Sequence, residues 1–77
     1  FVPVIESIET IRRAAHGYDW QVITDRGRIR FTVENDESIQ PLSGGGIVIV
    51  DRNNTRYLIP RCSAMDARSR QKLERYY

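Results

Sequence analysis

Apolar and polar residues alternate with a period of two between Trp20 and Glu34. The apolar or small residues of this alternation fall into two runs, one before and one after a short break: Trp20, Val22 and Thr24, then Ile29, Phe31 and Val33. This period is typical of strands with one buried face. The break at Asp25-Arg26-Gly27 predicts a three-residue hairpin loop, with a type I turn over Asp25 and Arg26 and a positive φ at Gly27. The pattern therefore predicts an antiparallel hairpin, with Trp20 and Phe31 in the core.

A second hairpin is predicted between residues 47 and 59. Residues 47–50 form a continuous β-branched run, Ile-Val-Ile-Val, which is typical of a central strand covered on both faces. Asp51 to Asn54 have the composition of a turn, with Asn54 as its left-handed residue. Residues 55–59 then return antiparallel, and Pro60 ends that strand because it cannot donate a ladder hydrogen bond.

The stretch from residue 2 to residue 15 fits two structures. The spacing of Ile5, Ile8 and Ile11 suits one face of a helix, whereas the many β-branched residues favour a strand. We expect a long, bulged strand. Between the two hairpins, residues 35–46 are predicted to form a connector with one helical turn at 36–39.

A helix is predicted at the C-terminus, capped by Ser63 or Asp66. Leu73, Tyr76 and Met65 would form the narrow apolar stripe that packs it on the sheet. Together these elements predict an α+β fold: an antiparallel sheet of about five strands, built from two hairpins and an N-terminal strand, with a C-terminal helix. The 77 residues fit one small domain, 1–77. A start at Phe1 rather than Met indicates a part excised from a longer protein.

Three parts of the chain carry a resemblance: residues 1–5, the run 20–31 with its turn at Gly27, and residues 56–60 leading into 66–70 and 73–75. They resemble the C-terminal half of a bacterial domain family of unknown function. That family is similar in context to proteins associated with cyanophycin metabolism, and occurs alone or beside ABC-transporter parts. The resemblance implies a bacterial, cytoplasmic setting, an accessory role and a missing N-terminal portion. It offers no catalytic residues to carry over.

Candidate chemistry is sparse. His16 is the only histidine and Cys62 the only cysteine, so the chain lacks the ligand set of a cysteine-rich metal site and any evident nucleophile–base pair. We expect His16 in an exposed loop and Cys62 as a small, partly buried apolar residue. Asp25, Asp51 and Asp66 each suit a turn or a cap. The sequence thus predicts a non-enzymatic domain with no cofactor and no metal.

Positive charge offers the one candidate surface. The net charge is +2, and every basic residue except Lys72 is arginine. The candidate polyanion-binding residues of the two hairpins are Arg26, Arg28, Arg30, Arg52 and Arg56.

The leading functional hypothesis is an accessory or protein-interaction domain. Its partner would be another protein or the missing N-terminal part of its own chain, and weak homo-oligomers are compatible with an unpaired strand edge in the N-terminal stretch. Nucleic-acid or other polyanion binding through the arginine-lined hairpins is the alternative. No apolar run approaches the roughly 18 residues of a membrane span, so we expect no membrane insertion.

Overall fold

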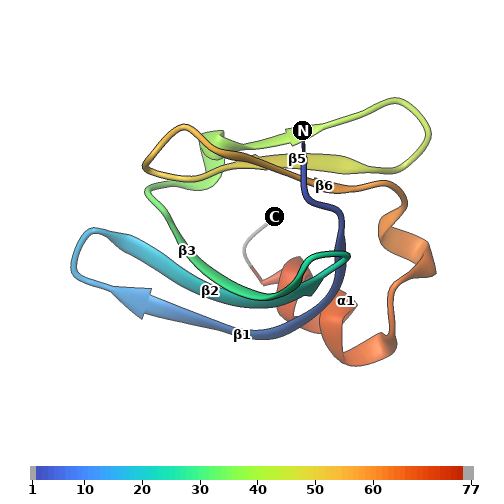
Figure 1. The fold of residues 1–77 in the computed structure, drawn as a ribbon, viewed down its shortest axis with the longest axis horizontal. Coiled ribbons are helices and arrows are strands. Elements are labelled where there is room, and N and C mark those ends of the chain that lie inside the picture. The colour runs from blue at the N-terminus through green and yellow to red at the C-terminus, as the bar shows by residue number, and fades with distance from the viewer. Residues whose placement is uncertain (1, 76–77) are drawn as a thin grey trace.

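Two three-stranded antiparallel sheets and a C-terminal helix make up the computed structural model, which describes residues 2–75 (Figure 1). The first sheet contains β1 (Ile5–Ala14), β2 (Gly17–Thr24) and β3 (Gly27–Val33). The second contains β4 (Ile39–Pro41), β5 (Ile47–Val50) and β6 (Arg56–Ile59). Two short 3₁₀ helices, Asp36–Ser38 and Cys62–Ala64, connect these elements, and α1 spans Ala67–Glu74.

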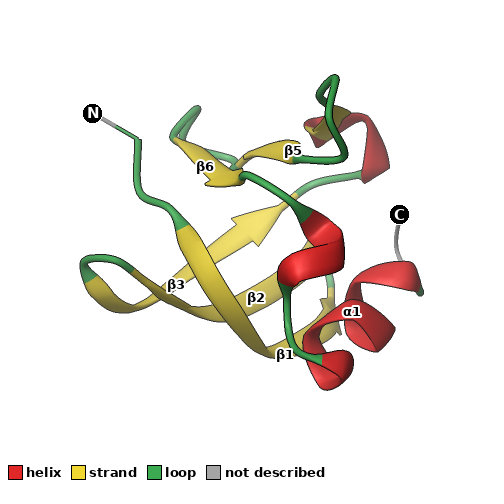
Figure 2. Ribbon diagram, turned by 90° about the vertical axis from the view of Figure 1, so that its right-hand side faces the viewer, coloured by secondary structure: helices red, strands yellow, loops and turns green. Residues whose placement is uncertain are grey.

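Both sheets are simple meanders in which each strand pairs with its neighbour in sequence. The α+β class is confirmed, but the prediction of one sheet of about five strands is wrong. Ile39–Pro41 adds a strand where the sequence suggested only a connector, and the two meanders pack face to face as separate sheets (Figure 2). Their edges meet only locally, for example where Val4, just before β1, forms a parallel bridge with Leu58 of β6. This arrangement follows because each meander has an apolar face that only a second layer can cover.

The long β1 strand contains two register shifts, between Ile5 and Ser7 and between Ile8 and Thr10. Ile5, Ile8 and Ile11 lie opposite β2 residues that are only two apart, namely Thr24, Val22 and Trp20. Each shift inserts one extra residue into β1, so positions three apart face the same side of the sheet. The expected bulged strand is confirmed, and the bulges explain its helix-like spacing.

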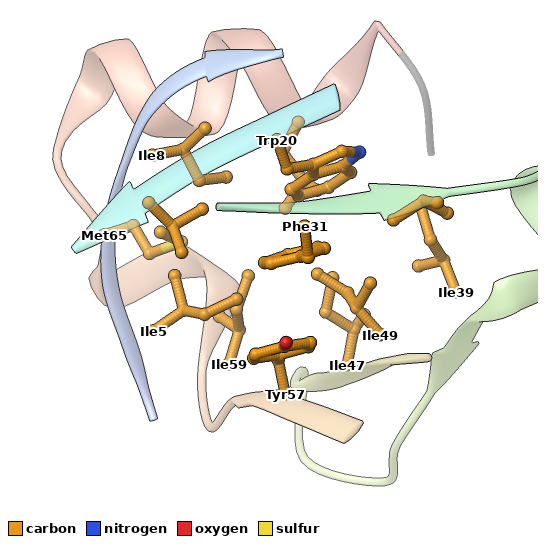
Figure 3. Close-up of a cluster of buried hydrophobic side chains, with 13 residues drawn as sticks. Ile5, Ile8, Trp20, Phe31, Ile39, Ile47, Ile49, Tyr57, Ile59 and Met65 are labelled. Carbon is orange, nitrogen blue, oxygen red and sulfur yellow. The ribbon is translucent and has the colours of Figure 1, made fainter. Parts of the chain in front are cut away.

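An aromatic stack joins the two sheets (Figure 3). The ring of Phe31 in β3 lies 5.7 Å from that of Trp20 in β2 and 4.1 Å from that of Tyr57 in β6, measured between centroids. Trp20 is 1% exposed, which confirms that Trp20 and Phe31 belong to the core. The indole Nε1 of Trp20 is buried and has no hydrogen-bond partner among the described residues.

Both hairpin turns contain the positive-φ residue that the sequence predicts. Gly27 has a φ of 100° and Asn54 a φ of 64°, as predicted. The first hairpin loop has two residues and not the expected three, because Gly27 already pairs with Thr24 as the first residue of β3. The expectation that residues 47–50 would be covered on both faces is wrong for the part of the chain described. Ile47 and Ile49 are buried against the first sheet, whereas Val48 and Val50 are half-buried on the outer face.

Helix α1 packs on β1 through Leu73 and a polar contact. Asp66 is its N-cap, and the carboxylate accepts a hydrogen bond from the Ser69 N–H at 3.1 Å. The buried Ser69 hydroxyl accepts the Ile8 N–H at 2.8 Å, and Lys72 Nζ donates to the Glu9 carbonyl at 2.6 Å. Met65 is buried as expected, and Tyr76 lies outside the described residues.

Candidate functional site

The outer face of the first sheet is polar and carries three arginines. Strand alternation turns Phe31 and Val33 into the core, so Arg28 and Arg30 of β3 point outward. They lie across from Ile23 and Gln21 of β2, and Arg12 of β1 lies across from Asp19. We call this surface, made by Arg12, Arg28 and Arg30, the arginine face.

Arg28 is already paired on the arginine face. Its Nε lies 2.7 Å from Glu9 Oε1, and its Nη2 donates to Glu9 Oε2 at 3.1 Å. Gln21 Nε2 donates to the same Glu9 carboxylate at 3.2 Å. The bidentate contact between Arg28 and Glu9 holds the Arg28 guanidinium close to β1, although 63% of the Arg28 side chain is exposed.

Arg12 and Arg30 differ from Arg28 in their surroundings. Neither has a hydrogen bond or ion pair with any residue that the structure describes. Both line a shallow hollow of about 180 Å³, together with Thr10, Asp19, Trp20 and Gln21. Asp19 accepts a hydrogen bond from the Thr32 hydroxyl at 2.9 Å. The hollow therefore offers two cations whose charge is not neutralised by a direct contact.

The five arginines singled out from the sequence do not form one patch. Arg28 and Arg30 lie on the outer face of the first sheet, whereas Arg56 alternates with buried Tyr57 and lies on the outer face of the second. These two faces point in opposite directions because the sheets pack face to face. Arg26 lies in the β2–β3 turn and Arg52 in the β5–β6 turn.

Arg12 was not among the predicted site residues. The side of the sheet on which Arg12 lies depends on the β1 bulges, because each bulge shifts the alternation by one residue. The bulges are hard to locate in advance in a stretch whose sequence fits both helix and strand. The repeated three-residue spacing of Ile5, Ile8 and Ile11 within a β-branched segment is the signal that could have located them.

The free edge of β3 is the second feature of this region. Residues 28, 30 and 32 alternate along the strand, so their backbone N–H and C=O groups point to the same edge. That edge faces away from β2, because the Thr32 carbonyl accepts the Arg52 N–H from the β5–β6 turn at 2.9 Å. No backbone hydrogen bond to another part of the described chain occupies the outward groups of Arg28 and Arg30.

The free edge of β1 is used differently. The Ile8 N–H is bonded to Ser69, and Lys72 donates to the carbonyls of Ile8 and Glu9. Helix α1 thus covers the middle of this edge, where the sequence suggested an unpaired edge. Between residues 2 and 75, the outward backbone groups of Arg28 and Arg30 form an unpaired stretch of edge on β3, and those of Ile11 and Arg13 form another near the end of β1.

His16 and Cys62 lie in unrelated parts of the fold. His16 is exposed in the turn between β1 and β2, as expected. Cys62 is half-buried beside a hollow of about 380 Å³ between the second 3₁₀ helix and α1, and burial raises the pKa of its thiol. Residues 2–75 contain no group of three or more His, Cys, Asp and Glu side chains placed to hold a metal ion.

Within the described part of the chain, no helix has the length and apolar character needed to cross a membrane.

Comparisons with known proteins give one result. Neither curated proteins nor solved structures provide a match. The model of one protein family, described as a domain of unknown function (DUF1854), matches residues 1–76. Because the match covers nearly the whole sequence, the chain belongs to the DUF1854 family.

Proposed function

We propose that this domain is a non-enzymatic interaction module that binds an extended segment of a protein by strand addition at the free edge of β3. Another protein or a different part of the same polypeptide could supply the segment. The observation that carries this proposal is the row of unpaired backbone groups at Arg28 and Arg30. Such groups pair readily with an incoming strand, and main-chain hydrogen bonds supply its affinity.

The surroundings of β3 support this use. The strand has seven residues, Gly27–Val33, and is held firmly on its other side by its pairing with β2. Its inward Phe31 is held in the aromatic stack and its inward Val33 is buried, so the edge is a rigid template. A preorganised edge lowers the entropy that binding must overcome.

Amide exchange with a neutral strand-forming probe tests the proposal. The probe is a capped octapeptide of alternating Thr and Val, added to the domain at millimolar concentration. Binding should slow hydrogen exchange at the Arg28 and Arg30 N–H groups, as measured by NMR. Unchanged exchange at both positions would overturn the proposal.

A pair of variants at one position separates the backbone from the side chain. Arg30→Pro removes the outward N–H without removing a bond to β2, and should abolish binding. Arg30→Thr keeps the N–H and should retain it. If Arg30→Pro binds the peptide as well as the wild type, strand addition is wrong.

Polyanion binding remains the second candidate function, and one observation favours it. Arg12 and Arg30 flank a hollow without direct neutralisation by any described residue. A single-stranded DNA decamer is a suitable probe. Affinity that falls steeply with salt, without protection of the β3 amides, would favour this alternative over strand addition.

A further inference from the structure

We infer that the segment added to β3 carries carboxylates at alternate positions, with apolar residues between them. This inference rests on the proposed strand addition and names the chemistry of the ligand. It follows from the side chains that an added strand would meet on each side of the edge.

Carboxylates are expected on the outer side. An added residue that pairs with Arg28 or Arg30 places its side chain on the same face as the arginine, with Cβ atoms roughly 5 Å apart. Arg30 has no ion-pair partner among the described residues, whereas Arg28 is paired to Glu9. A carboxylate opposite Arg30 would therefore have that guanidinium to itself. A carboxylate opposite Arg28 would share the Arg28 guanidinium with Glu9.

Apolar side chains are expected on the inner side. The residues of β3 that alternate with the arginines are Ile29, half-buried, and Phe31, buried in the stack between the sheets. An added residue that pairs with either of them points toward the core. A polar side chain there would lose water without gaining a partner.

The same charges disfavour a second copy of this chain as the occupant. Pairing β3 with β3 of another copy would bring four arginines together on one face of the joined sheet. Among the described residues, only Glu9 of each copy contacts these arginines, and like charges placed opposite each other destabilise a sheet. Charge complementarity thus selects an acidic strand over self-pairing.

Three capped octapeptides that differ only in charge test the inference: alternating Asp and Val, Thr and Val, and Lys and Val. We expect the Asp peptide to bind about three- to tenfold more tightly than the Thr peptide, from one or two cross-strand charge pairs, and the Lys peptide to bind most weakly. All three dissociation constants come from the same NMR titration at low salt.

Matched variants locate the effect. Arg30→Thr should bring the Asp and Thr peptides to nearly equal affinity, whereas Arg56→Thr, on the opposite face, should leave the preference unchanged. Equal binding of the Asp and Thr peptides to the wild type, with the β3 amides protected, would overturn this inference and leave strand addition standing. Protection by none of the peptides would overturn strand addition itself. Binding of the Asp peptide without β3 protection would also overturn the inference, in favour of polyanion binding.

Discussion

Asp51 stabilises the β5–β6 turn from a buried position. Its Oδ1 accepts the N–H groups of Asn53 and Thr55, both at 2.9 Å, and its Oδ2 accepts the Tyr57 hydroxyl at 2.9 Å. Because the Tyr57 ring stacks on Phe31, this one carboxylate connects a surface turn to the aromatic stack. Burial, followed by the hydrogen bond to Asp51 and its charge, raises the pKa of Tyr57 to about 12.

The Tyr57 hydroxyl should give the stability a specific dependence on alkaline pH. The folded state holds the proton more tightly than an unfolded chain, whose tyrosine pKa is about 10. The stabilisation is therefore fully present below pH 10 and is lost as the pH rises from about 10 to about 12. Tyr57→Phe should cost about 1–3 kcal/mol at pH 7, because a buried carboxylate oxygen loses its donor.

Urea denaturation of both proteins at several pH values checks this expectation. The difference in the free energy of unfolding between wild type and Tyr57→Phe should shrink above pH 10, and comparing the two proteins cancels the groups that they share. A difference that stays constant up to pH 11.5 would contradict the Tyr57–Asp51 hydrogen bond.

Helix α1 and strand β1 come from opposite ends of the chain and meet at Ser69. The Ser69 hydroxyl accepts the Ile8 N–H and donates to Asp66 Oδ1 at 2.6 Å, so it serves the strand and the helix cap together. The hydrogen bond from the Ser69 hydroxyl and the one from the Ser69 N–H both lower the pKa of the Asp66 carboxyl.

Ser69→Ala should lower the free energy of unfolding by about 1–3 kcal/mol, because the buried Ile8 N–H loses its acceptor. It should also raise the Asp66 pKa, which an NMR titration can follow. Ser63→Ala is the control, since that side chain is exposed near the same helix. Equal denaturation midpoints for the two variants would show that Ser69 does not join α1 to β1.

Most elements could be predicted from local chemistry, and those that could not depend on partners distant in sequence. Gly27 and Asn54 mark their turns because they adopt a positive φ, and Asp66 marks the helix cap because its carboxylate accepts the Ser69 N–H. Strand β4 has only three residues and ends at Pro41, so its own sequence scarcely indicates a strand. It forms because Ile39 packs in the core and pairs with β5.

The two sheets depend on each other through the core. Phe31 lies between Trp20 of its own sheet and Tyr57 of the other, so its ring fills the space where the layers meet (Figure 3). A domain of this size has few other large side chains to compensate for such a loss.

Phe31→Ala should therefore cost about 3–5 kcal/mol, which is enough to unfold the domain or nearly so. Phe31→Leu, which keeps much of the volume, should cost clearly less. Circular dichroism and urea denaturation measure both variants. A folded Phe31→Ala variant that fails to bind the strand-forming peptides would instead make the aromatic pair part of the recognition surface.

The candidate site was less predictable than the fold. Strand alternation alone assigns Arg28 and Arg30 to an outer face, but whether Arg56 shares that face depends on how the two hairpins are arranged. The sequence permits them to be neighbours in one sheet, and face-to-face packing separates them. The open edge of β3 is likewise a property of the whole molecule, since it exists only because no other described strand pairs there.

Trp20 is the only tryptophan of the chain, and its position makes it an internal optical reporter. Its indole is shielded from water, so the folded protein should emit at short wavelength, and exposure on unfolding should shift the emission to the red. Because Phe31 separates its ring from Tyr57, the emission depends on the first sheet and on the layer beneath it. Ordinary fluorescence can therefore follow the docking of the two sheets in real time, with no label attached.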